Sequence, residues 1–227
     1  MKDIHFPTIF IISLAGSDRR AKISERLTGL GLHFEFIDAV YGITLSREEL
    51  SQVDYNYYPE RFSAQKTLTP GEIGCAMSHI KLYEYMSKMN IPEAIILEDD
   101  AIVSQCFKEI VLDVLKKIPS RKEIVFFDHG KAKSYLFKRN IVEGYRLVRY
   151  RYPSKKSKRA IMRTTAYLIT LNGVKKLLNH AYPIRMPSDY LTGAIQLTGV
   201  HAYGIEPPCV FMGTESEIDS IEQREKS

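Results

Sequence analysis

The stretch AIILEDD, residues 94–100, decides the fold class. Four apolar residues in a row are typical of a short strand that is buried on both faces, as in a parallel sheet. Three carboxylates follow where that strand ends. Because ligands of open α/β sheets bind beyond the carboxyl ends of the strands, the stretch predicts a buried strand with a polar site at its end.

Helices are expected on both sides of this strand. Residues 69–72, Thr-Pro-Gly-Glu, form a capping box with proline at the first helical position, and they predict a helix that runs to about Met89. After the strand, apolar residues from Phe107 to Ile118 repeat at helical spacing. Further strands are expected at residues 10–14, 34–40, 124–127, 166–170 and 202–205. This alternation predicts an α/β fold whose sheet is mostly parallel.

Smaller segments carry their own signals. A second capping box begins at Ser46 and predicts a short helix. Residues 55–66 are rich in tyrosine and polar side chains, and we expect a loop there. Asn172 is expected to cap the helix that follows the strand at 166–170. Residues 214–227 are expected to form a polar tail.

Composition indicates one large α/β domain. The chain has 227 residues, enough for a substantial core. The apolar run at residues 9–12 is too short to span a bilayer or to form the core of a signal peptide. Three cysteines without framework spacing indicate a reducing compartment, so a cytoplasmic location is expected.

Positive charge is concentrated in one segment. Residues 131–163 contain twelve Lys or Arg and one acid, a charge of +11, so the rest of the chain carries 5 − 11 = −6. Such a segment attracts nucleic acid, phosphorylated glycans or an anionic membrane, although a solvated surface loop is the common alternative. Nucleic-acid binding is not expected, because the sequence shows no recognisable nucleic-acid-binding module.

The acidic triplet at residues 98–100 has two interpretations. Adjacent carboxylates repel each other unless a cation joins them, and carboxylate oxygens are ligands for Mn²⁺ or Mg²⁺, which can in turn hold a diphosphate. Alternatively, the triplet is a solvated turn in which one acid caps the next helix.

Residues 68–79, LTPGEIGCAMSH, and residues 95–101, IILEDDA, closely resemble glycosyltransferase family 25. This family includes bacterial lipooligosaccharide galactosyltransferases and collagen galactosyltransferases. The resemblance covers nearly the whole chain, with further matching blocks at residues 11–14, 18–20, 38–42, 166–169, 173–177, 187–190 and 207–208. Two features depart from the family: Ser13 stands where asparagine is usual, and the basic segment is poorly matched.

The resemblance implies a GT-A-like fold in a single domain over residues 1–213. A Rossmann-like nucleotide-sugar half would occupy about residues 1–130, and an acceptor half with the basic segment would occupy residues 131–213. The implied reaction is a metal-assisted, inverting transfer of galactose from UDP-galactose to a lipooligosaccharide or lipopolysaccharide core acceptor. Transfer of glucose or another hexose is the alternative. The enzyme would bind peripherally at the inner face of the inner membrane.

The resemblance also implies roles for individual residues. Asp100, with Asp99 or Glu98, would hold Mn²⁺ or Mg²⁺. Asp189 is the first candidate for the general base, and the N-terminus of its helix is expected to lower its pKa; a helix cap would equally explain it. Donor-binding candidates are Ser13, Arg19, Arg20, Glu72, Glu98 and Asp99.

Several side chains keep an alternative assignment. Asp128 and His129 follow a predicted strand and are either reserve candidates for the base or part of a turn. The capping box alone explains Glu72, and a solvated surface explains the two arginines. Cys75 and His79, at positions i and i+4, could share a metal, but helix packing is the commoner role of such a pair.

Two rival functions differ in class or chemistry. Residues 95–100 also resemble the start of a receiver domain, with Asp128 as phospho-acceptor. However, the interval from Asp100 to Asp128 holds one helix too few for that arrangement. A nucleotidyltransferase is expected to carry a glycine-rich, basic loop after its first strand, and residues 15–17 do not supply one.

Overall fold

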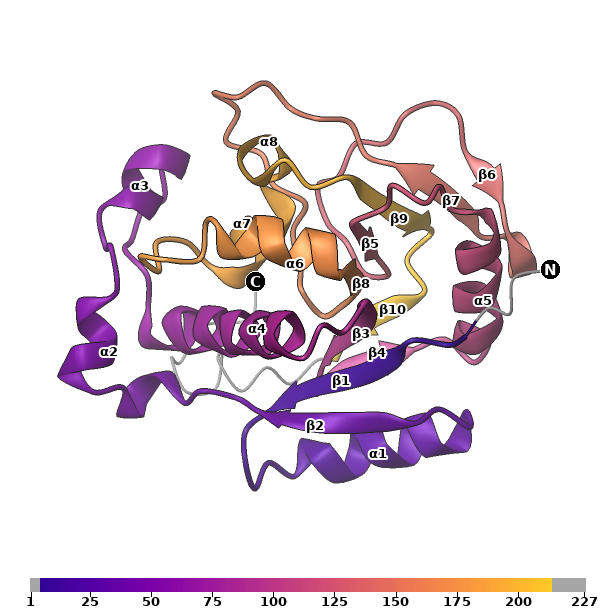
Figure 1. Cartoon of the computed structure of the whole chain (residues 1–227), viewed down its shortest axis with the longest axis horizontal. Helices are drawn as coiled ribbons and strands as arrows, with labels where there is room; N and C mark the ends of the chain where they lie inside the picture. The colour runs from indigo at the N-terminus through magenta and orange to yellow at the C-terminus, as the bar shows by residue number, and fades with distance from the viewer. Residues whose placement is uncertain (1–4, 214–227) are drawn as a thin grey trace.

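The predicted strand at residues 94–97 lies inside an eight-stranded sheet (Figure 1). The structure, a computed structural model, describes residues 5–213. Across the sheet the strands are β2 (Phe34–Asp38), β1 (Thr8–Ser13), β3 (Glu93–Glu98), β8 (Ala166–Thr170), β5 (Ile124–Phe126), β9 (Ala202–Glu206), β7 (Arg146–Arg149) and β6 (Arg139–Asn140). Six of these strands point in one direction, which confirms the expected α/β sheet.

The two reversed strands, β7 and β8, were not expected. Strand β8 is antiparallel to both of its neighbours, β3 and β5. Strand β7 is antiparallel to β9 and β6. Four of the seven neighbouring pairs are therefore antiparallel. The receiver alternative does not fit this sheet, because that doubly wound fold has an all-parallel order.

Helices cover both faces of the sheet, because successive strand residues point to opposite sides. The helices are α1 (Arg19–Gly29), α2 (Arg47–Ser51), α3 (Tyr57–Phe62), α4 (Pro70–Lys88), α5 (Phe107–Lys117), α6 (Leu171–Leu178), α7 (Ser188–Gly193) and α8 (Ile195–Thr198), with 3₁₀ turns η1 (Gly42–Thr44) and η2 (Val142–Gly144). Ile9 and Ile11 of β1 belong to a buried cluster that includes α1 and α5. Phe10 and Ile12 belong to the opposite cluster, which includes α4, α6, α7 and α8.

A second, two-stranded sheet follows the acidic triplet. Strand β4 (Ala101–Val103) pairs antiparallel with β10 (Val210–Met212). The backbone N–H of Gly213 donates to the carbonyl of Asp100 at 2.9 Å. The end of the described chain therefore fixes the backbone of the triplet, a contact that the sequence did not indicate.

Local predictions are confirmed at both capping boxes and corrected elsewhere. Thr69 and Ser46 each make the two reciprocal bonds of a capping box. Residues 55–66 were predicted as a loop but include α3, because Phe62 packs 4.4 Å from the ring of Tyr190. Thr170, not Asn172, caps α6 through the N–H of Gly173. The expected tail lies outside the described residues.

The basic segment includes the hairpin of β6 and β7, whereas the sequence showed no clear period there. Strands β7, β8 and β9, all from residues 131–213, share one sheet with β1, β3 and β5. Among residues 5–213, no helix has the length and apolar character that crossing a membrane requires.

Candidate active site

A pocket lies beyond the carboxyl ends of β1, β2 and β3, at the position where open α/β sheets bind ligands. The acidic triplet forms one side of it. Ser13 and Arg19 line it from the end of β1 and the start of α1, while Gly71 and Cys75 line it from α4. The predicted strand-end site therefore exists as a pocket built from four segments of the chain.

Two glycines allow the wall of this pocket to form. A Cβ on Gly42 would lie 1.7 Å from the carbonyl oxygen of Pro70, and a Cβ on Gly74 would lie 2.7 Å from that of Val40. Ser78 accepts from the N–H of Val40 at 2.8 Å and donates to the carbonyl of Gly74 at 2.7 Å. Residues 38–42 and the start of α4 thus pack as one unit.

Asp99 holds the end of β1 against the end of β3. The hydroxyl of Ser13 donates to its carboxylate at 2.7 Å, and Arg19 lies 3.4 Å away. Because Asp99 is tied to these neighbours, its position fits a structural role in shaping the pocket. Ser13 and Arg19 line the pocket as well.

Arg20 has a different setting from Arg19. Its guanidinium donates to the carbonyl of Ser13 at 2.9 Å, pairs with Asp38, and lies over the ring of Phe36 at 4.8 Å. It is not among the residues that line the pocket. Arg20 therefore joins the ends of β1 and β2.

Glu98 faces partners on two other elements. Thr164, just before β8, donates to its Oε1 at 2.6 Å, and His79 of α4 lies 3.4 Å from the same oxygen. Burial raises the pKa of Glu98, but His79 and Thr164 together lower it by more than burial raises it. The pKa of Glu98 therefore lies below its ordinary value. Glu98 is therefore a fixed negative charge at the pocket.

Asp100 offers a carboxylate oxygen that a divalent cation could bind. Its Oδ1 is buried and has no hydrogen-bond partner among residues 5–213. Burial, followed by repulsion from Glu98, raises the pKa of Asp100 to about 7. A cation would relieve both effects, and a carboxylate oxygen is a suitable ligand for Mn²⁺ or Mg²⁺. The predicted metal role of Asp100 is compatible with this geometry.

Asp189 lies in the first turn of α7, close enough to Glu98 for the two carboxylates to repel each other. We expected the helix N-terminus to lower its pKa, and that direction is wrong. Burial first, and then the charge of Glu98, raise the pKa of Asp189 to about 6, although backbone N–H groups of Arg163 and Tyr190 oppose the rise. A helix of six residues does not offset burial beside another carboxylate.

The start of α7 is joined to the acidic triplet through two hydroxyl side chains to which the sequence assigned no role. The hydroxyl of Ser188 lies 3.2 Å from that of Thr164, which binds Glu98. It also lies 3.1 Å from Sγ of Cys75. Ser188 lies in the matching block at residues 187–190 but had no role assigned to it, and Thr164 carries no motif, so only the fold reveals their contacts.

Asp189 and the remaining candidates lie outside the pocket lining. Glu72 accepts from the N–H of Thr69 at 2.9 Å, as its capping box requires. Asp128 is fully buried and pairs with Arg163 at 3.0 Å, while its Oδ2 has no hydrogen-bond partner within the described chain. His129 donates from Nε2 to the carbonyl of Ile205 at 2.9 Å. These contacts give each side chain a structural role.

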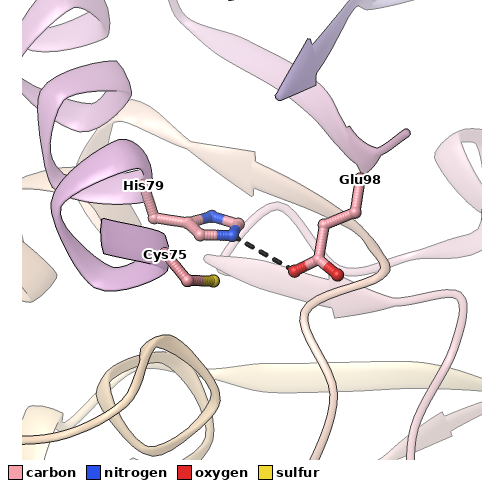
Figure 2. Close-up of side chains that lie close together, drawn as sticks. All are labelled: Cys75, His79 and Glu98. Carbon is pink, nitrogen blue, oxygen red and sulfur yellow. Dashed lines mark hydrogen bonds and ion pairs between the residues drawn. The ribbon is translucent and has the colours of Figure 1, made fainter. Parts of the chain in front are cut away.

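Cys75 and His79 project from adjacent turns of α4 towards Glu98 (Figure 2). One potential ligand atom from each of the three residues lies within 4.8 Å of the others. His79 also stacks on Tyr167 and contacts its hydroxyl through Nδ1 at 2.8 Å. The packing expected of this pair is therefore present, and the fold adds a carboxylate to it.

Comparisons with known proteins agree on one family. The model of glycosyltransferase family 25, described as an LPS biosynthesis protein, matches residues 6–192. Procollagen galactosyltransferase 1-A of Xenopus laevis is 27% identical over 80% of this chain and 29% of its own length. A glycosyltransferase 25 family member of Aedes aegypti is 32% identical over 75% of this chain and 27% of its own. The chain thus spans less than a third of these relatives.

Two further proteins are similar to this chain. "Probable inactive glycosyltransferase 25 family member 3" of Bos taurus is 27% identical over 81% of this chain and 31% of its own length. A crystal structure of a glycosyltransferase involved in glycosylation of the major capsid of PBCV-1 matches 76% of this chain and 66% of its own, with 11% identity and a TM-score of 0.35. On the family match over residues 6–192, the chain belongs to glycosyltransferase family 25.

Proposed function

We propose that this protein is an inverting, metal-assisted glycosyltransferase that transfers galactose from UDP-galactose to a lipooligosaccharide or lipopolysaccharide core. The observation that carries the proposal is the buried, unpartnered Oδ1 of Asp100 in a pocket at the carboxyl edge of the sheet. Family membership and the galactosyltransferase among the relatives support the donor. Glucose, which differs in one hydroxyl orientation, is the alternative sugar.

Each pocket residue has a separate proposed role in binding the donor. Asp100 would hold Mn²⁺ or Mg²⁺, which supplies stabilisation of the charge that develops on the leaving diphosphate. Ser13 and Asp99 fix the turn that carries Asp100. Arg19 is at the same wall and adds positive charge on the side where phosphates would bind. Glu98 stays ionised through His79 and Thr164 and orients the turn.

Asp189 is the proposed general base for the acceptor hydroxyl. A base acts best when its pKa is close to the operating pH, and burial brings the pKa of Asp189 to about 6. It is then a stronger base than an exposed aspartate and still ionised at pH 7.5. The short helix α7 and the contacts of Ser188 hold it in place.

Membrane binding is the proposed role of the basic segment. Leu136 and Phe137 are each 96% exposed, and Lys133, Lys138 and Arg139 lie beside them in the chain. These two exposed apolar side chains can enter the interface of a bilayer, while the cations face anionic lipid. This arrangement would bring the enzyme to a glycolipid acceptor at the cytoplasmic face of the inner membrane.

A donor panel tests the proposal without an acceptor. Purified protein with Mn²⁺ is mixed with UDP-galactose, UDP-glucose, a GDP-sugar and a CMP-sugar, and thermal stabilisation and slow hydrolysis are measured. UDP-galactose should give the largest effect, and Asp100→Asn should remove its metal dependence. Stronger stabilisation by the CMP- or GDP-sugar would refute the donor assignment, and a larger effect of UDP-glucose would select the alternative sugar.

A further inference from the structure

We propose that Cys75, His79 and Glu98 form a binding site for a thiophilic divalent cation such as Zn²⁺, distinct from the Mn²⁺ position at Asp100. Their thiol, imidazole and carboxylate groups lie within 4.8 Å of one another (Figure 2). Thiol, imidazole and carboxylate are the ligands that zinc takes in proteins, and three protein ligands leave a fourth position open.

The spacing of the ligand atoms fits a tetrahedral ion. His79 Nε2 and Glu98 Oε1 are 3.4 Å apart. Two such atoms on one zinc ion, at about 2.0–2.2 Å each, are separated by about 3.4 Å in tetrahedral geometry. A thiolate sulfur would lie about 3.6 Å from either of them. At most, Cys75 Sγ therefore has to approach by about 1.2 Å.

The surroundings hold two of the ligands in position. The Nδ1 atom of His79 is hydrogen-bonded to the hydroxyl of Tyr167 at 2.8 Å, and that hydroxyl contacts Tyr83 at 2.6 Å. Both tyrosines are fully buried. Thr164 donates to Glu98 at 2.6 Å. Partners of this kind orient metal ligands and strengthen their binding.

Ligand chemistry separates this site from the one at Asp100. Thiolate and imidazole favour Zn²⁺ or Co²⁺, whereas carboxylate oxygens alone favour Mn²⁺ and Mg²⁺. Cys75 and Glu98 line the pocket, so a cation can enter from it. An ion held there would place positive charge in the pocket wall and would use the carboxylate of Glu98 as a ligand.

Cobalt spectroscopy tests the site on the full chain. Co²⁺ is titrated into the reduced protein while the thiolate-to-cobalt absorption in the near ultraviolet is recorded. One equivalent should produce the band, Zn²⁺ should remove it stoichiometrically, and millimolar Mn²⁺ should not. Cys75→Ser should abolish the band. Cys106→Ser is the matched control, because Cys106 contacts Ser104 and is not in the pocket lining.

Glu98→Gln provides a second variant that keeps the side chain's shape, and it should weaken Co²⁺ binding by about tenfold or more. No band in the wild-type protein would overturn the proposal. So would a band that survives Cys75→Ser but is lost in Cys106→Ser, or one that Mn²⁺ displaces. The measurement uses no nucleotide sugar, so its outcome is independent of the proposed glycosyl transfer.

Discussion

The hydroxyl of Ser13 donates to the carboxylate of Asp99 at 2.7 Å and ties the end of β1 to the turn after β3. Ser13→Ala removes this bond to a largely buried charge. We expect the free energy of unfolding in urea to fall by about 1.5–3 kcal/mol, the scale of a hydrogen bond to a charged group. Ser13→Asn keeps a donor and should recover part of the loss. Equal stability of the alanine variant and wild type would show that the bond contributes nothing.

Asp100→Asn should separate metal binding from folding. The folded-state pKa of about 7 lies above the ordinary value of 3.8, so this carboxyl favours the folded state least at high pH. The free-energy cost of burying the ionised Asp100 carboxylate in the folded state grows as the pH rises from about 4 to about 7. Without metal, the variant should therefore be more stable than wild type at pH 8, by on the order of 4 kcal/mol, and little different at pH 4.

The same variant should lose the thermal stabilisation that Mn²⁺ gives to wild type. Differential scanning fluorimetry at pH 4 and pH 8, with and without Mn²⁺, measures both effects. Undiminished stabilisation by Mn²⁺ would mean that the triplet is only a turn.

Asp189→Asn should preserve binding of donor and metal but reduce transfer by roughly 10²-fold or more, the scale of a lost general base. In wild type, kcat/KM should rise as the pH increases through about 6 and level off above it, because the carboxylate must be ionised. The residual activity of the Asp189→Asn variant should not show this rise of kcat/KM with pH. Loss of donor binding together with transfer would make Asp189 a donor ligand. No change in either would make it a cap and turn attention to Asp128 or His129.

The double change Leu136→Ser and Phe137→Ser should weaken binding to anionic vesicles by about tenfold or more, since each apolar side chain contributes about 1.5–3 kcal/mol when fully buried. Raising the salt concentration should weaken the binding of the wild-type protein to these vesicles, because salt screens the lysines and arginines. Sedimentation with vesicles measures both. Met89→Ser, a change at another exposed apolar residue, is the matched control. Binding that salt does not affect, or that is absent at low salt, would contradict the proposed contact.

Much of the fold could be predicted because its signals are local. The capping box at Thr69 and Glu72 depends on residues three apart, and the strand at residues 166–170 is an apolar run with clear ends. The reversed direction of β8 could not be predicted, since it depends on the path of the irregular chain before it. Helix α3 was missed because contacts such as Phe62 with Tyr190 hold it, and these form only on folding.

The candidate site, like the fold, could be predicted only where its signals are local in the sequence. Three carboxylates adjacent in sequence marked the strand end, and the unpartnered oxygen of Asp100 is compatible with that prediction. The direction of the pKa shift of Asp189 was missed, because burial and the nearby Glu98 are properties of the fold. Thr164 joins these elements without any sequence signal, and Ser188 does so from the matching block at residues 187–190, which did not indicate this contact.

The central place of β8 also governs the order in which the chain can fold during synthesis. Its pairing partners, β3 and β5, end at Glu98 and Phe126, whereas β8 begins at Ala166. Until the ribosome has made residue 170, both partners present unpaired edges that other strands could join. Emerging chains shorter than this are therefore prone to aggregation, and chaperone protection should matter most before β8 is released.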